Sequence, residues 1–276
     1  MLTSGIARSA IDAISGKLVA VPQVAPLSIY REIKPMAHSY EDLAKMIDHS
    51  LLHPTMTDQT LEEGIALARA YDVASVCIMP YYLKRCAELL DGSTVQASTT
   101  IGFPHGGHTT AIKVAETEQA IKDGCQEFDM VVNISKVLSE DWDYVTADIK
   151  AVIEPVHAAG QKVKVIFENC YLEDRHKIKL CEICSDLNAD WVKTSTGYGT
   201  GGATIEDLTL MRKHAAEHVQ VKAAGGVRDA ETLVKVRELG ISRVGASRTK
   251  SMMDEVRKNL GLPEINVGDT ANPSGY

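Results

Sequence analysis

The sequence predicts an α/β protein in which eight parallel strands close into a (β/α)8 TIM barrel. From Tyr40 onward, a short apolar run is followed by a turn and then by a longer amphipathic stretch, and this unit occurs eight times. Strands that alternate with helices in this way form parallel sheets. A doubly wound open sheet is the alternative, but no GxGxxG pattern follows the first strand.

Strands are expected where short runs are rich in apolar and β-branched residues. In chain order they cover residues 46–50, 73–79, 95–103, 127–133, 162–168, 190–196, 219–224 and 243–247. The stretches between them have helical spacing, over residues 58–71, 80–90, 109–123, 142–159, 173–187, 204–217, 229–239 and 248–260. Helix-start residues at Thr57 and Asp229, and glycines 124, 160 and 240 near helix ends, support these limits.

Composition excludes several classes of protein. The chain has 276 residues, 45% of them hydrophobic, and a net charge of −8 with both signs mixed throughout. This balance disfavours a nucleic-acid partner, and no apolar run approaches the roughly 20 residues that span a membrane. Six cysteines scattered through predicted core elements fit a reducing, cytoplasmic location. Cys181 and Cys184 form a lone CxxC, for which core packing is the better interpretation.

Three segments are expected along the chain. Residues 1–37 form an N-terminal extension, helical or irregular, that packs outside the barrel; it has few acidic residues and prolines at 22, 26 and 35. Residues 38–262 form the barrel, and residues 263–276 form a C-terminal tail. The sequence is compatible with a homo-oligomer but does not set its size.

Four charged residues within predicted strands are candidates for the active site. Asp48, Asp129, Lys193 and Lys222 lie on the first, fourth, sixth and seventh strands. Their separations of 81, 64 and 29 residues are close to whole multiples of one βα unit, which takes about 30 residues. All four therefore fall at a similar phase of the repeat and can face one mouth of the barrel, where catalytic groups of such barrels lie.

Two lysines on adjacent strands predict amine chemistry. Each disfavours the charge of the other, and partial burial adds to the effect. A lysine depressed in this way attacks a carbonyl to form a Schiff base, with a nearby carboxylate such as Asp129 as acid and base. The alternatives are that Lys193 reaches solvent from a strand end or pairs with Asp190, and that these residues form a structural ion-pair network.

Glycine-rich helix starts after the last three strands predict a phosphate site. Barrels bind phosphate there through backbone N–H groups and helix N-termini. The residues concerned are Gly197, Gly225, Gly226, Gly245 and Ser247. His105 and His108 follow the third strand, but two histidines without a third ligand are weak evidence for zinc, so no metal site is predicted.

Seven motifs together resemble the deoxyribose-phosphate aldolase family of Schiff-base (class I) aldolases, from about Leu43 to Leu260. They are IDHSLLHP at 47–54, VASVC at 73–77, IGFPHG at 101–106, EFDMVVN at 127–133, VKTSTG at 192–197, VKAAGGVR at 221–228 and GAS at 245–247.

The resemblance implies that Lys193 forms the Schiff base, Lys222 tunes its pKa and relays protons, Asp129 exchanges protons, and Asp48 supports Lys222. It implies reversible cleavage of 2-deoxy-D-ribose 5-phosphate to acetaldehyde and D-glyceraldehyde 3-phosphate, without metal or other cofactor. A related aldolase for another phosphorylated or deoxy sugar, or a phosphate-binding barrel without aldol activity, are the alternatives.

Overall fold

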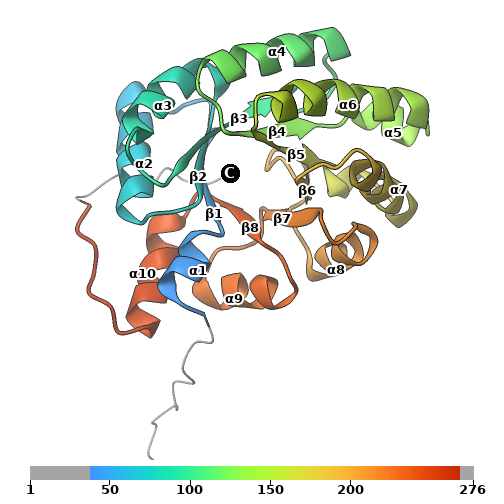
Figure 1. Ribbon diagram of the computed structural model, residues 1–276. Helices are drawn as coiled ribbons and strands as arrows, with labels where there is room; N and C mark the ends of the chain where they lie inside the picture. Colours follow the sequence, from blue (N-terminus) through green and yellow to red (C-terminus); the bar gives the residue numbers. More distant parts are fainter. Residues whose placement is uncertain (1–37, 268–276) are drawn as a thin grey trace, which may run out of the picture. The chain divides into compact units, whose positions relative to one another are not determined.

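Eight parallel strands close into a barrel, as the sequence predicts. The computed structural model describes residues 38–267, so the expected N-terminal extension and residues 268–276 of the tail lie outside the described residues. The strands follow one another around the barrel in chain order, and β8 pairs with β1 (Figure 1). Their bounds are β1 Ile47–Leu51, β2 Ser75–Ile78, β3 Gln96–Ile101, β4 Glu127–Val131, β5 Lys162–Ile166, β6 Trp191–Lys193, β7 Gln220–Ala224 and β8 Arg243–Ala246.

Helices surround the barrel, and the eight predicted helical stretches are present. The corresponding elements are α2 Asp58–Ala70, η1 Pro80–Tyr82 with α3 Leu83–Leu90, α4 Thr110–Lys122, α6 Trp142–Ala158, α7 Asp174–Asp186, α8 Ile205–His214, α9 Ala230–Glu238 and α10 Thr249–Asn259. Three short helices were not predicted: α1 Tyr40–Ala44, α5 Ile134–Leu138 and η2 Asn169–Tyr171. Each has at most five residues, too few for a helical period to stand out.

Side-chain caps fix where several helices begin. The Thr57 hydroxyl accepts a hydrogen bond from the Thr60 N–H at 3.2 Å, and the Asp229 carboxylate accepts one from the Thr232 N–H at 2.7 Å. Both satisfy a donor that the first helical turn leaves unpaired. At the other end of α9, Gly240 has a φ of 82°, the left-handed conformation that ends a helix. The predicted helix limits at these residues are therefore confirmed.

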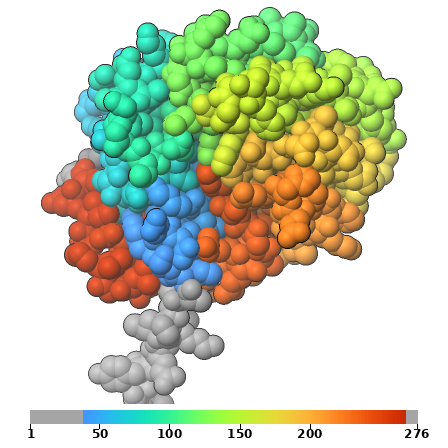
Figure 2. Space-filling model, in the orientation of Figure 1, coloured from blue at the N-terminus to red at the C-terminus, as the bar shows by residue number. Residues whose placement is uncertain are grey.

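The first and last helices of the described residues contact each other on the outside of the barrel. Helices α1 and α10 contact each other and lie side by side in both views (Figures 1 and 2). The Tyr71 hydroxyl donates a hydrogen bond to Asp254 on α10 at 2.5 Å, and the Arg257 guanidinium lies 4.9 Å from the centroid of the Tyr40 ring. No helix in residues 38–267 is long and apolar enough to cross a bilayer.

The apolar core lies between the strands and the helices. Phe128, Val163, Val165, Val192 and Val221 are fully buried there. Because successive strand residues face opposite sides of a sheet, their neighbours in the sequence face the barrel axis. Several of those neighbours are charged, so the outer layer supplies the apolar burial and the interior is left for an ionic cluster.

A buried ion pair behind β3 and β4 gives a stability prediction. Lys113 on α4 donates to Asp148 at 2.6 Å and to the Val131 carbonyl at 2.8 Å, and both charged side chains are at most 1% exposed. Lys113→Ala leaves the Asp148 carboxylate buried without its cation, which we expect to cost about 3–5 kcal/mol of unfolding free energy. Urea denaturation followed by circular dichroism measures this loss.

Lys150→Ala is the matched control, since Lys150 pairs with Glu154 on the exposed face of α6 at 3.6 Å. Its removal should cost less than about 0.5 kcal/mol. Equal losses in the two variants would contradict the importance of the buried pair.

Candidate active site

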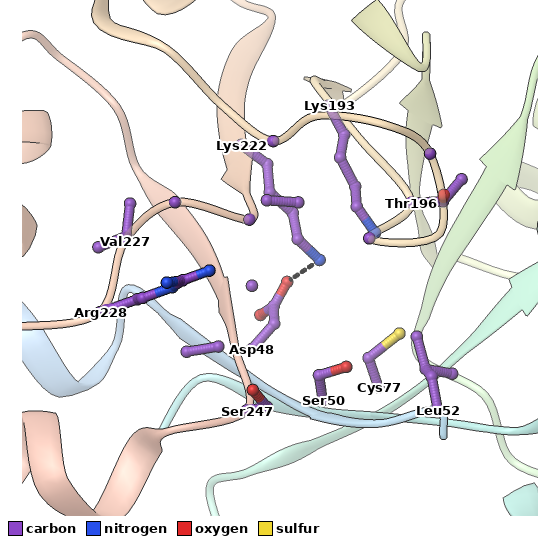
Figure 3. Close-up of a pocket in the computed structure, with 18 of the residues that line it drawn as sticks. Asp48, Ser50, Leu52, Cys77, Lys193, Thr196, Lys222, Val227, Arg228 and Ser247 are labelled. Atoms are coloured by element: carbon purple, nitrogen blue, oxygen red, sulfur yellow. Dashed lines mark ion pairs between the residues drawn. The ribbon is translucent and has the colours of Figure 1, made fainter. Parts of the chain in front are cut away.

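A cavity of about 470 Å³ opens at the C-terminal ends of the strands. It is lined mainly by residues of β1, β6, β7 and β8 and the loops that follow the last three (Figure 3). Eight of the nine residues predicted for the site line it: Asp48, Lys193, Gly197, Lys222, Gly225, Gly226, Gly245 and Ser247. The ninth, Asp129, is buried beside them and bonds to both lysines.

The two predicted lysines stand side by side. Lys193 on β6 is in direct register with Lys222 on β7, and both side chains extend toward the cavity (Figure 3). Asp129 on β4 joins them, because its Oδ2 accepts a hydrogen bond from each Nζ at 2.7 Å. The similar phase that the sequence predicts therefore corresponds to contact in space.

Asp48 holds the second lysine. Its Oδ2 lies 2.6 Å from the Nζ of Lys222, the ion pair drawn in Figure 3. Its Oδ1 accepts hydrogen bonds from the Ser75 hydroxyl and from the Arg243 guanidinium, both at 2.7 Å. Asp48 therefore links Lys222 to a cation deeper in the barrel.

Three charged residues of this cluster were missed by sequence reasoning. Lys164 on β5 donates to Asp129 Oδ1 at 2.9 Å and lies 2.7 Å from Glu127. Arg243 makes a two-pronged pair with Glu127, with both distances 2.7 Å. Lys164 could have been found, since it lies between Val163 and Val165 in a predicted strand. Glu127 and Arg243 begin their strands, where charged residues usually meet solvent.

The charges of this cluster balance only when one amine is neutral. It contains four cationic groups, Lys164, Lys193, Lys222 and Arg243, and three carboxylates, Asp48, Glu127 and Asp129. A buried charge without a counter-charge is costly. The lysine with the lowest pKa is therefore the one that gives up its proton most easily.

Among the three lysines of the cluster, only Lys193 has a lowered pKa. Burial lowers the pKa of Lys193; Asp129 opposes this change, and the nearby charge of Lys222 adds to it. Burial also disfavours the charge of Lys222, but Asp129 and Asp48 outweigh it and raise the pKa of Lys222. Burial is the larger cause of the lowered pKa of Lys193, and the charge of Lys222 acts in the direction that the sequence predicts.

Accessibility also distinguishes Lys193. It is 3% exposed, whereas Lys164 and Lys222 are fully buried. The alternative that Lys193 pairs with Asp190 is wrong: the Asp190 carboxylate accepts from the Val163 N–H at 2.9 Å and lies 3.0 Å from His157. The alternative of an ion-pair network describes Lys164, Glu127 and Arg243 correctly. It does not explain why the amine of Lys193 lies at the wall of the cavity.

Glycine-rich backbone, in the loops that follow β6 and β7, makes up another part of the cavity wall. Gly225 and Gly226 have φ of 72° and 90°, and a Cβ at Gly226 would lie 2.8 Å from the Ala203 carbonyl oxygen. The Ala203 N–H donates to the carbonyls of Ala224 and Gly225 at 3.0 and 3.1 Å, so the loops after β6 and β7 are joined. Helices α9 and α10 begin just beyond, which is the arrangement that suits an anion.

Comparisons with known proteins agree with this geometry. Residues 43–249 match the model of the family described as DeoC/LacD family aldolase. The chain belongs to this aldolase family. It is 68% identical over 239 residues to the deoxyribose-phosphate aldolase of Rhodopirellula baltica, covering 87% of this chain and 99% of the relative.

More distant members of the family agree. The deoxyribose-phosphate aldolase of Caldanaerobacter subterraneus is 45% identical over 221 residues, covering 80% of this chain and 96% of the relative. A tetrameric deoxyribose phosphate aldolase from Aeropyrum pernix superposes with a TM-score of 0.74 at 27% identity, covering 79% of this chain and 92% of that structure. The likeness to aldolases thus extends over most of the chain.

The charge balance of this aldolase gives a pH prediction. Lys222→Leu removes one cation, so the three carboxylates can keep Lys193 charged, and its pKa should rise toward or above the ordinary value of 10.5. The amine attacks only when unprotonated, so its reaction with acetaldehyde should need a higher pH in the variant. Borohydride trapping across a pH series gives the midpoint in both proteins. A midpoint that stays or falls would contradict the electrostatic role of Lys222.

Proposed function

We propose that this aldolase reversibly cleaves 2-deoxy-D-ribose 5-phosphate into acetaldehyde and D-glyceraldehyde 3-phosphate, with Lys193 as the Schiff-base lysine. The observation that carries the proposal is the cavity itself. One wall presents the single amine of the buried cluster that is both accessible and depressed in pKa. The rest of the wall includes glycine backbone next to the starts of α9 and α10. The identity to the Rhodopirellula baltica enzyme supports the same substrate.

In the cleavage direction, the neutral amine of Lys193 attacks C1 of the open-chain sugar, and loss of water gives a protonated imine. A base removes the proton of the C3 hydroxyl. The electrons of the C2–C3 bond then move toward the imine, and D-glyceraldehyde 3-phosphate leaves. The resulting enamine takes a proton at C2, and hydrolysis of the imine releases acetaldehyde and the free lysine.

Asp129 and Lys222 are suited to the proton transfers. Asp129 Oδ2 lies 2.7 Å from both the reacting nitrogen and the Lys222 ammonium, within the range for direct transfer. Burial would raise the pKa of Asp129, but the three surrounding lysines hold it well below its usual range. We therefore assign proton exchange to the pair, with Lys222 as the charged member and Asp48 as its support.

The phosphate is assigned to the glycine-rich wall. Gly197, Gly225, Gly226, Gly245 and Ser247 line the cavity there, and their backbone N–H groups and the Ser247 hydroxyl are suitable donors. An anchored phosphate fixes C1 of the sugar near Lys193, and such orientation contributes several kcal/mol to the lowering of a barrier.

The nucleophile is tested by trapping. Incubation with acetaldehyde and borohydride should add a reduced two-carbon group to Lys193, and peptide mass spectrometry locates it. Lys193→Met should give no adduct and no aldol cleavage, while Lys162→Met, at the exposed start of β5, should behave as the unchanged protein. An adduct only on another lysine would overturn the assignment.

The phosphate site is tested by charge. Ser247→Glu places a carboxylate against the phosphate, and we expect KM for 2-deoxyribose 5-phosphate to rise about tenfold or more, since like charges in contact cost several kcal/mol. KM for unphosphorylated 2-deoxyribose should change far less. Ser139→Glu, on an exposed turn after α5, is the control and should alter neither. Equal changes for both sugars would count against the site.

A further inference from the structure

Glu168 occupies an unusual position just beyond the end of β5. Its backbone lies in the left-handed region, with φ of 59° and ψ of 62°, which is uncommon for residues other than glycine. It is 2% exposed. It makes no ion pair with any residue in the range 38–267, although a buried carboxylate is costly unless it is well bonded.

The backbone around Glu168 forms a bulge against the strand that carries Lys193. The Phe167 N–H donates to the Lys193 carbonyl at 3.0 Å, and the Asn169 N–H donates to the Thr194 carbonyl at 2.9 Å. The two N–H donors are two residues apart in the chain, whereas the two carbonyl acceptors are adjacent residues. Glu168, between the two donors, is therefore an extra residue in the pairing of the two segments. Bulges beside active sites redirect a side chain.

The redirected side chain holds the start of the glycine-rich loop after β6. Glu168 Oε1 accepts from the Thr196 N–H at 3.2 Å, and Oε2 accepts from the Thr196 hydroxyl. That hydroxyl in turn accepts from the Tyr198 N–H at 3.0 Å. A Cβ at Gly199 would lie 3.0 Å from the Glu168 carboxyl carbon, so the loop passes directly over this carboxylate.

The loop fixed in this way faces the cavity, but Glu168 does not. Thr196, Gly197 and Gly199 line the cavity, whereas Glu168 is absent from its lining. Gly202, at the far end of the same loop, packs on Gly225 so closely that a Cβ would lie 2.8 Å from the Gly225 carbonyl carbon. The position of Glu168 therefore affects both glycine loops assigned to phosphate.

We propose that Glu168 is a positioning residue, which sets the phosphate-binding loop at a fixed place relative to Lys193. It does so by bonding Thr196 through its side chain while its bulge is bonded to the backbone of Lys193 and Thr194. The proposal rests on the proposed function for the identity of the anion. It predicts that changes at Glu168 affect recognition of the phosphate and spare the amine chemistry of Lys193.

The test compares Glu168→Gln and Glu168→Gly. Gln keeps the size of the side chain, but its NH2 group replaces one of the two carboxylate oxygens that accept from Thr196, so one of these two hydrogen bonds is lost. Gly removes the carboxylate and adopts the left-handed backbone without strain. We expect Gln to raise KM for 2-deoxyribose 5-phosphate about tenfold, as for a lost hydrogen bond to a charged group, and Gly to raise it further. Trapping of acetaldehyde on Lys193 and KM for 2-deoxyribose should not change.

Glu140 provides the matched control. It is also a glutamate with positive φ, 54°, but it lies on an exposed turn between α5 and α6. Glu140→Gln and Glu140→Gly should leave both sugars and the trapping reaction unchanged.

Two results would overturn the proposal. One is an unchanged KM for the phosphorylated sugar in Glu168→Gly. The other is an equal loss for both sugars and for trapping, which would mean a general structural role. Inhibition of acetaldehyde trapping by inorganic phosphate separates this proposal from the proposed function. If the unchanged protein binds phosphate but does not cleave the sugar, weaker phosphate binding in Glu168→Gln still supports the positioning role.

Discussion

A single carboxylate, Asp129, bonds to three lysines at the centre of the barrel. Its Oδ1 accepts from Lys164 at 2.9 Å, and its Oδ2 accepts from Lys193 and Lys222 at 2.7 Å. One negative charge cannot neutralise three ammonium groups, so the remaining carboxylates of the cluster decide where the protons lie. The cluster has three carboxylates for four cationic groups, and the chemistry that we assign to Lys193 follows from this imbalance.

An ionic barrel interior is unusual, since barrels of this kind are commonly filled with branched apolar side chains. Removing charges from water is costly, and the attraction between them repays that cost only with good geometry. Here the two-pronged Arg243–Glu127 pair, at the base of the cluster, has such a geometry. The apolar layer between strands and helices supplies the burial that the interior lacks. The fold can therefore tolerate a buried cluster with more cationic groups than carboxylates beside the cavity.

Much of this arrangement could be predicted from the sequence, because the βα repeat sets both the fold and the phase of residues on successive strands. The spacing of Lys193 and Lys222 predicts that they lie on adjacent strands, and the structure puts them in register. The βα repeat does not predict ion pairs between strands that are far apart in the sequence, because these depend on how the strands are staggered around the barrel. Arg243 and Glu127 begin β8 and β4, yet the barrel brings them together. The role we propose for Glu168 could not be predicted, because it depends on a backbone bulge that residue types alone do not indicate.

The pKa of Lys193 tests the central claim most directly. Nuclear magnetic resonance of the protein labelled with ¹³C at the lysine ε-carbons follows each amine through a pH titration, and loss of one signal in Lys193→Met assigns it. We predict that Lys193 titrates below the ordinary lysine value of 10.5, while Lys164 and Lys222 titrate above it. A Lys193 signal that titrates at or above that value would contradict the account.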